Sequence, residues 1–561
     1  MEELLKNPNF DLCLIFFVLL AIFFVIGIID AKNNKKKLLE YFRSNYGKKS
    51  GKDKLPIGYK KYYEEKRGDS FSIDEITASD ISLDDVFMKL DNCLSVPGFN
   101  ILYSMLRLPK LNSSEIGELV KDCDSFDDDI IRENIQLELC TLGRNSRKSV
   151  FDFFKLVDIS GKNNLFSISL LLLYIIGIVL LITNAAAGIV VLIILLCVSI
   201  LSYFRLKSKY SEYIEPAYYL LRILKSGRNI SEYKSDKDIS INTKIDALSK
   251  RCKKLKKTFA GSGYVFLSSN ANKNLLSSIT QYLNMLFHID LILFYSIYKK
   301  IKANKEEFIS LYEDIGYIDA CISINIYKKS LKVFCNPSFD ESKIIKDLYH
   351  PLIKGAVAND AHLNKAILIS GSNASGKSTY LKSIALSIVM AQGIGLVNAS
   401  EYKMPILRLY SSMSVRDSIA KGDSYFMAEI KALKRIIDAS DSGDIPVACF
   451  IDEILKGTNT AERIAASCQI LKMLCGRDMV LATATHDQEL TYLLKDYVAN
   501  YHFTENMESE DVRFTFHILE GPSDTTNAIK LLRRLGYDGK LTDNAQLMVD
   551  NHEKTKEWAL I

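Results

Sequence analysis

The chain has 561 residues with 72 basic and 67 acidic side chains, which gives a net charge of +5 at pH 7. This length allows three or four domains of roughly 150 residues each, and a charge so close to balance does not by itself indicate a nucleic-acid partner. The 11 cysteines include no C-x-x-C pair, which argues against a zinc site and favours reduced thiols over a disulfide framework.

Three uncharged segments are long enough to cross a membrane, namely residues 12–29, 165–182 and 185–204. At about 1.5 Å per residue, each helix would span roughly the thickness of the hydrocarbon core. One such segment would be compatible with a buried core helix, whereas three, each flanked by charge, favour a membrane. The first is predicted to be an uncleaved anchor within residues 1–31, because acidic residues precede it and no small-residue cleavage site follows it.

Basic flanks predict the orientation of these segments. The basic residues that follow the first and third segments are Lys32, Lys35, Lys36, Lys37, Arg205, Lys207 and Lys209. Such flanks face the cytoplasm. We therefore expect a multi-pass protein of the cytoplasmic membrane, with its N-terminus outside, a minimal outer turn at Thr183–Asn184, and the rest of the chain in the cytoplasm.

The remaining stretches differ in periodicity. Residues 32–70 are basic and lack apolar periodicity, which is typical of a juxtamembrane linker. Helical spacing dominates residues 71–164 and 205–329, on either side of a membrane hairpin at 165–204, with a break expected at Pro97–Gly98. Short strand-type runs alternate with helical stretches over residues 330–540, which predicts an α/β domain with a mainly parallel sheet, followed by a tail at 541–561. The expected strands are residues 366–369, 447–451, 479–482 and 512–519.

A phosphate-binding motif follows the first of these strands. The motif G-x-x-x-x-G-K-[ST] and the residue after it comprise Gly371, Ser372, Asn373, Ala374, Ser375, Gly376, Lys377, Ser378 and Thr379. A strand before it and a helix after it are the context that such a P-loop needs. Backbone N–H groups would surround the phosphates, Lys377 would reach the β- and γ-phosphates, and Ser378 would bind Mg²⁺. We therefore predict that ATP and Mg²⁺ bind here.

Two further strands end in polar residues that would complete the site. The strand at 447–451 leads into Asp452 and Glu453, and carboxylates at the end of a buried strand need partners. Asp452 fits a second Mg²⁺ ligand, and Glu453 fits the base that orients the attacking water. The strand at 479–482 leads to His486, which we expect to sense the γ-phosphate. The predicted catalytic residues of an ATP hydrolase are thus Glu453, Lys377 and His486.

The order of these motifs resembles the MutS family, the ABC-class ATPases of mismatch repair and their relatives. The similar segments are His350–Leu352, Ala358–Asp360, Gly371–Lys382, Met390–Val397, Asp417–Glu429, Ile451–Thr460 and Ala484–Leu490. A weaker similarity at Thr77–Ile81, Val86–Leu90 and Leu102–Pro109 looks like the start of that family's helical lever domain.

The resemblance implies an ABC-class domain that works as a head-to-tail homodimer. Ser424 lies in the segment that looks like the family's signature loop, and it would contact the γ-phosphate held by the partner subunit. ATP binding would then close the dimer and move the levers. The expected fold is an α/β ABC-class P-loop ATPase domain with an α-helical lever-like region that carries three transmembrane helices.

Three features depart from the family pattern. Only residues 32–70 lie between the anchor and the lever-like region, which leaves no room for the mismatch-reading domain, and Tyr62-Tyr63-Glu64 is interpreted as linker. The aromatic residue expected to stack on adenine is absent near Ala356, and Tyr425 stands where the family has threonine. We therefore expect an ATPase related to mismatch repair that lacks mismatch recognition.

The partner of this ATPase is left open. DNA is one hypothesis, because a basic cluster could contact phosphates, although a solvated helix face explains the cluster somewhat better. The cluster comprises Lys250, Arg251, Lys253, Lys254, Lys256 and Lys257. The alternative is an ATP-driven membrane motor or switch that acts on lipid or on an unknown protein partner without DNA. A transporter is disfavoured because no charge within the apolar segments marks a substrate path.

Overall fold

The computed structural model describes most of the chain and forms two compact units. The described residues are 26, 29, 30, 32–68, 70–144, 150–155, 162–234, 239–259, 275–371, 375–413, 425–506, 513–523, 529, 532, 533 and 535–555. We call the first unit, Met1–Ser70, Phe87–Met105 and Gly117–Lys332, the helical unit. The second, Phe71–Val86, Leu106–Ile116 and Val333–Ile561, is the α/β unit. The division falls inside three helices, α4 (Leu83–Leu90), α5 (Val96–Arg107) and α6 (Ser113–Asp124).

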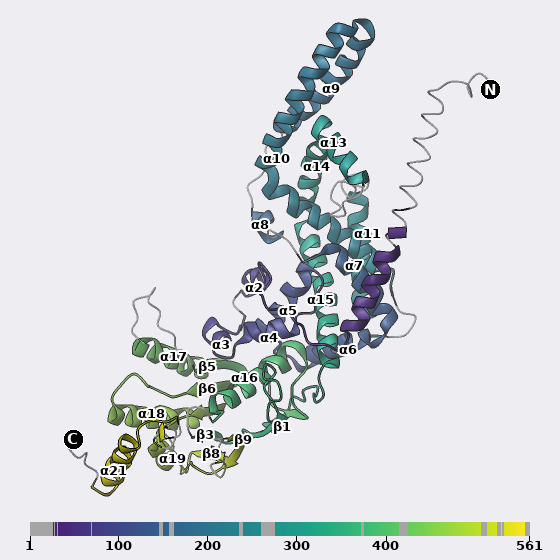
Figure 1. Cartoon of the computed structure of the whole chain (residues 1–561). Helices are drawn as coiled ribbons and strands as arrows, with labels where there is room; N and C mark the ends of the chain where they lie inside the picture. The colour runs from purple at the N-terminus through teal and green to yellow at the C-terminus, as the bar shows by residue number, and fades with distance from the viewer. Residues whose placement is uncertain are drawn as a thin grey trace. The chain divides into compact units, whose positions relative to one another are not determined.

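The helical unit is built around one long helix (Figure 1). In α15 (Lys305–Lys329) the side chains from Ile318 to Tyr327 are all buried, as expected for a helix surrounded by others. Residues 32–45 are also helical. The other elements are α2 (Lys61–Lys66), η1 (Ser125–Asp127), α7 (Asp129–Leu142), α8 (Val150–Lys155), α9 (Lys162–Thr183), α10 (Ala185–Ile230), α11 (Ile241–Thr258), α13 (Leu275–Phe287) and α14 (Ile289–Ala303).

The break expected at Pro97–Gly98 is wrong, because both residues lie in the first turn of α5. Proline is tolerated there, since the first N–H groups of a helix have no partner within it. Gly98 has a packing role instead. A Cβ atom at this position would lie 2.0 Å from Oδ2 of Asp319 on α15, so only glycine lets the two helices approach.

The segment expected to be a linker contains packed structure. Tyr63 of α2 is buried, and the neighbouring Tyr62 donates a hydrogen bond of 3.0 Å to Glu313. Upstream, Arg43 forms two hydrogen bonds of 2.7 and 2.8 Å with the Glu133 carboxylate. Residues 32–66 therefore contribute to the helical unit.

Helices α9 and α10 form a pair that is long and apolar enough to cross a membrane. The two apolar stretches, Leu165–Thr183 and Ala185–Tyr210, both have a mean hydropathy of 2.9, and only 22% and 17% of their windows are buried. A Cβ atom at Gly188 would lie 2.3 Å from Cα of Leu181, so glycine lets the helices touch. Beyond its apolar part, α10 continues without interruption to Ile230. The expected anchor at residues 12–29 lies almost wholly outside the described residues.

The α/β unit contains a six-stranded sheet in the order β5-β6-β7-β3-β8-β9, in which only β9 is antiparallel to its neighbour. The four strands expected from the sequence are confirmed within one or two residues at each end. The strands are β3 (Ala366–Ser370), β5 (Arg408–Ser412), β6 (Val447–Asp452), β7 (Met479–Ala484), β8 (Val498–Asn506) and β9 (Arg513–Glu520). The helices are α3 (Glu75–Asp80), α16 (Lys377–Ile394), α17 (Tyr425–Ser440), α18 (Thr460–Cys475), α19 (Gln488–Leu493) and α21 (Gly539–Thr555).

A second sheet of three strands was not expected from the sequence. It has the order β2-β1-β4 and is antiparallel throughout, with β1 (Ile344–Leu348), β2 (Asn359–His362) and β4 (Glu401–Lys403). One hydrophobic core cluster of the α/β unit packs α17 and α18 against the large sheet. Its members include Leu433, Ile436, Cys449, Ile451, Leu471 and Leu481, all at most 4% exposed.

Candidate functional site

The polar residues predicted from the sequence follow three adjacent parallel strands. Strands β6, β7 and β3 are neighbours, with Asp452 of β6 opposite Ala484 of β7, and Ala484 opposite Ile369 of β3. The carboxyl ends of parallel strands meet at one edge of a sheet, which is where ligands bind in open α/β folds. Two further hydrogen bonds extend the strands there, from the Glu453 N–H to Ala484 and from the Thr485 N–H to Ile369, both 3.0 Å.

The loop after β3 turns sharply at two glycines. Gly371 and Gly376 have φ values of +133° and +110°, which L side chains rarely adopt. Between them, Ser372, Asn373 and Ala374 lie outside the described residues. Lys377 is buried at the start of α16, and its Nζ donates a hydrogen bond of 2.6 Å to the Gly371 carbonyl. The ammonium group is therefore held beside the Gly371 backbone, where a bound phosphate would replace the carbonyl as its partner.

Ser378 and Asp452 form the pair predicted to hold Mg²⁺. Ser378 donates a hydrogen bond to the Asp452 carboxylate. Burial raises the pKa of Asp452, while that hydrogen bond opposes the rise. Among the described residues no group of three or more His, Cys, Asp or Glu side chains is arranged to hold a metal ion. The pair nevertheless fits Mg²⁺, because this ion is usually bound by one or two protein oxygens together with phosphate oxygens and water.

Glu453 is held in a strained backbone conformation and between two basic side chains. Its φ is +56°, in the left-handed region that non-glycine residues seldom enter. Oε1 lies 2.6 Å from Nε2 of His486, and Oε2 contacts Nζ of Lys456. The hydrogen bond from His486 is the largest cause that lowers the pKa of Glu453, to about 2, with Lys456 adding to it. Glu453 is thus a carboxylate held at the edge of the sheet, and His486 donates a hydrogen bond to it.

The turn after Glu453 is joined to α17 and to the end of β7. The buried Glu429 of α17 accepts a hydrogen bond of 3.2 Å from the Lys456 N–H. Farther along, Arg463 of α18 binds the Asp487 carboxylate through two hydrogen bonds of 2.9 and 2.6 Å. Asp487 directly follows His486, so the bond from Arg463 to Asp487 restrains the backbone next to the histidine.

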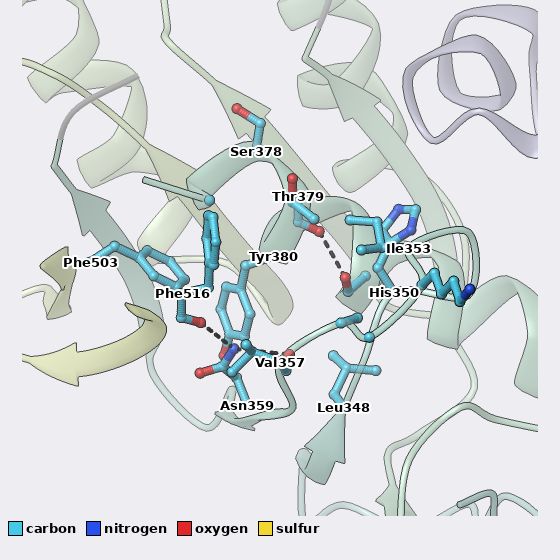
Figure 2. Close-up of a pocket in the computed structure, with 15 residues that line it drawn as sticks. Leu348, His350, Ile353, Val357, Asn359, Ser378, Thr379, Tyr380, Phe503 and Phe516 are labelled. Carbon is cyan, nitrogen blue, oxygen red and sulfur yellow. Dashed lines mark hydrogen bonds between the residues drawn. The ribbon is translucent and has the colours of Figure 1, made fainter. Parts of the chain in front are cut away.

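A pocket of about 360 Å³ adjoins Gly376 and the start of α16 (Figure 2). Figure 2 shows the rings of Phe503, Phe516 and Tyr380 gathered on one side of it, with Leu348 and His350 away from them. The remaining lining residues are Ile353, Lys354, Gly355, Ala356, Val357, Asn359, Gly376, Ser378, Thr379 and Ser383. An apolar cavity with aromatic side chains on one side, next to the residues predicted to bind phosphate, has the composition expected of a base-binding pocket.

Phe516 owes its position to Asn359. The Asn359 side chain donates a hydrogen bond to the Phe516 carbonyl and accepts one from the Ile518 N–H, both 2.9 Å. These bonds hold β9 where Phe516 has a φ of +54°. The Phe516 ring in turn lies against the loop, because a Cβ atom at Gly376 would be 3.3 Å from its Cδ1.

The structure thus brings Lys377, Ser378, Asp452, Glu453 and His486 to one edge of the sheet. Ser424 lies outside the described residues, and Tyr425 is the first residue of α17. Sequence reasoning missed the aromatic residues of the pocket. It looked for them only near Ala356, and no local motif around Phe503 or Phe516 marks them.

Comparison with known proteins finds similarity over the part of the chain that carries this candidate site. The family model described as MutS domain V matches residues 367–553. The DNA mismatch repair protein MutS of Thermotoga maritima is 28% identical over 273 residues, which cover 47% of this chain and 34% of that protein. The MutS proteins of Methanosarcina barkeri and Streptococcus uberis are 27% and 26% identical over 278 and 281 residues, which cover 47% and 46% of this chain and 31% and 33% of theirs. The chain therefore spans about a third of the length of the curated relatives it matches.

Proposed function

We propose that this chain is a membrane-bound MutS-like ATPase that hydrolyses ATP as a head-to-tail dimer, because the family model described as MutS domain V matches residues 367–553. The observation that carries the proposal is the cluster of Lys377, Ser378, Asp452, Glu453 and His486 at the carboxyl ends of β3, β6 and β7. Phosphate binding, cation binding and water activation need these groups together.

Each residue has a proposed role that follows from its contacts. Lys377 binds the β- and γ-phosphates once they displace the Gly371 carbonyl, which is 2.6 Å away. Ser378 and Asp452 hold Mg²⁺, which when bound neutralises phosphate charge. Glu453 orients the attacking water as a general base. His486 keeps the Glu453 carboxylate ionised and in place. Ser424 of the partner subunit completes the site in this proposal, as the family resemblance implies.

The nucleotide base is proposed to occupy the aromatic pocket. Phe516 and Phe503 supply the stacking surface that is absent near Ala356, and the cavity of about 360 Å³ lies next to Thr379 and Tyr380 on α16. Stacking of a base on an aromatic ring contributes roughly 1–3 kcal/mol. The edge strand β9, which carries Phe516, would thus supply the aromatic contact with the base.

Membrane attachment is proposed to run through the α9–α10 hairpin and the segment 12–29. Exposure of most of the apolar surface of both helices favours lipid contact over a soluble core. With basic residues at the cytoplasmic ends, the proposed orientation has the N-terminus outside and the α/β unit in the cytoplasm.

DNA is the partner we propose first, because the relatives are named DNA mismatch repair proteins. In the basic cluster on α11, Arg251 pairs with Asp314 at 2.8 Å and Lys254 contacts Glu307, while Lys250, Lys253, Lys256 and Lys257 are exposed. The second candidate is a motor or switch that acts on lipid or on a protein, which the exposed apolar hairpin favours. Duplex DNA retained by the detergent-solubilised protein at low salt and released at high salt supports the first candidate. If the protein retains no duplex DNA at low salt, the second candidate, a motor or switch without DNA, is favoured.

The test of the ATPase uses Glu453→Gln with Glu489→Gln as control, since Glu489 is an exposed residue of α19. For each variant of the solubilised full chain, two quantities are measured. These are the steady-state rate of Mg²⁺-ATP hydrolysis and, by light scattering, the fraction of dimer in the presence of ATP. We expect Glu453→Gln to abolish turnover and to accumulate a dimer with bound ATP, and Glu489→Gln to match the unmodified protein. Unchanged turnover in Glu453→Gln would contradict the assigned base.

A further inference from the structure

Helices α13 and α14 meet at a bend that packs against the α9–α10 hairpin (Figure 1). The bend is a single residue, His288, which lies between Phe287 at the end of α13 and Ile289 at the start of α14. The φ of His288 is +53°, in the left-handed region that non-glycine residues seldom enter. His288 is 0% exposed, and Asn284, one turn earlier, is also buried. The bend is therefore enclosed by protein.

The His288 ring joins both helices of the hairpin. Its Nδ1 lies 3.2 Å from Oγ of Ser167 on α9, and its Nε2 lies 3.0 Å from the carbonyl of Ser199 on α10. Because a carbonyl can only accept, Nε2 carries the hydrogen, and Nδ1 can accept from the serine. Beside the ring, the Tyr203 hydroxyl of α10 donates a hydrogen bond of 2.9 Å to Oδ2 of Asp290 on α14. The polar groups of the bend thus have partners on the hairpin.

Phe287 shows how far along the hairpin the bend reaches. Its ring meets the Tyr174 ring edge to face, with the centroids 5.2 Å apart, and it packs against the cluster of Leu170, Tyr174 and Leu195. Tyr174 follows the first residue of the apolar stretch Leu165–Thr183 by nine residues, which is about 14 Å along the helix axis. The bend therefore contacts the hairpin well inside its apolar part, and not at the charged flank.

The chain on both sides of the bend has the composition that this depth requires. Across residues 275–298 the sequence contains one Asp, Glu, Lys or Arg side chain, Asp290, and the first lysine of α14 is Lys299. Irregular backbone at membrane depth is tolerated only where protein covers it, as it does at His288. Tyr282 of α13 is 67% exposed. The exposed face of α13 is thus continuous with the exposed apolar surface of the hairpin.

We propose that the α13–α14 bend enters the membrane beside the hairpin, and that the face of α13 that carries Tyr282 contacts lipid acyl chains. This inference rests on the membrane attachment in the proposed function, and it adds a third packed element to it. Hydrogen bonds between helices, such as those of His288, hold such elements together in lipid, where the hydrophobic effect does not. Since α14 leads through Asn304 into α15, the inserted bend is continuous with the core of the helical unit.

The test measures quenching of tryptophan fluorescence by brominated lipid in the full chain. Trp558 is the single tryptophan of the sequence, so Trp558→Phe gives a background without signal. Tyr282→Trp and Met285→Trp then report on α13, Ile176→Trp on the exposed middle of α9, and Ile130→Trp on an exposed position of α7. Each variant is reconstituted in phosphatidylcholine vesicles, with bromine near the headgroup end or near the middle of the acyl chains, or with none. Thermal unfolding shows which variants fold.

We expect at least one brominated lipid to quench Tyr282→Trp and Met285→Trp by a fraction similar to that of Ile176→Trp, and neither lipid to quench Ile130→Trp. If Tyr282→Trp does not fold, Met285→Trp decides. Quenching of Ile176→Trp without quenching on α13 overturns the inference and leaves the membrane attachment standing, because water or protein then covers α13. Equal quenching of Ile130→Trp also overturns it, since the whole unit would then adsorb to the vesicle. If Ile176→Trp is not quenched, the proposed attachment through the hairpin fails, and the inference fails with it.

Discussion

The Nε2 atom of His486 lies 2.6 Å from Oε1 of Glu453, so two residues that follow different strands act as one group. This contact arises because β6 and β7 are neighbours in the sheet. It also explains why Glu453 tolerates a φ of +56°, since strain at such a site persists only where surrounding contacts determine the geometry.

His486→Ala should therefore impair the use of Glu453 rather than nucleotide binding. Loss of the hydrogen bond frees the carboxylate, and we expect kcat to fall by roughly a hundredfold with little change in KM. Single-turnover hydrolysis with saturating ATP measures the effect, and His517→Ala, an exposed histidine of β9, serves as control. A rise in KM at constant kcat would show that His486 binds nucleotide instead.

Phe516→Ala should weaken nucleotide binding without changing the chemistry. Stacking of roughly 1–3 kcal/mol corresponds to an increase in KM of about fivefold or more. The control is Leu519→Ala on the same strand, because Leu519 is similarly exposed and does not line the pocket. Binding of ATP and of triphosphate without a base is compared by calorimetry. If both variants bind ATP alike, the base lies elsewhere.

The stability of the α/β unit should fall on mild acidification because of His350. Burial lowers the pKa of His350 to about 4, from 6.5, and its Nδ1 accepts a hydrogen bond from the Leu352 N–H, as a neutral imidazole can. Between these values the unfolded chain binds more protons, so the free energy of unfolding decreases as pH falls from about 6.5 to about 4.

The size of this loss is at most about 3 kcal/mol. Chemical denaturation at pH 7 and pH 5 measures it, and His350→Gln should flatten the dependence. His362→Gln, at an exposed histidine of β2, should leave it as it is. An unchanged pH dependence in His350→Gln would assign the effect to another group.

Two glycines of the helical unit should respond to alanine in opposite ways. Gly98→Ala places a Cβ atom 2.0 Å from Asp319 Oδ2, whereas the same change at Gly117 on α6 meets nothing within 4 Å. We expect Gly98→Ala to destabilise the helical unit by about 1–3 kcal/mol or more. Gly117→Ala should stabilise it slightly, because alanine favours helix. Thermal unfolding of both variants under one condition decides, and equal midpoints would mean that Asp319 can move aside.

Much of the fold could be predicted because its signals are local. The strands at 366–369 and 447–451 are apolar runs of strand length, and α9 and α10 are apolar over the thickness of a bilayer. The error at Pro97–Gly98 shows the limit of such signals. The local sequence predicts a break at this pair. The glycine is instead required by the close approach of Asp319, which lies more than two hundred residues away in the chain.

The sequence by itself predicted the polar residues of the candidate site, because a G-x-x-x-x-G-K-[ST] motif between a strand and a helix, followed by strands that end in acidic residues and a histidine, is typical of a P-loop ATPase. It did not mark Phe503 or Phe516. It also did not determine which residues of the site touch. That depends on strand order, which sets Glu453 beside His486, brings Phe516 of the last strand against Gly376, and leaves the edge of β5 open for α3. Contacts between residues far apart in the chain are selected by packing of the whole unit, so only the tertiary structure decided them.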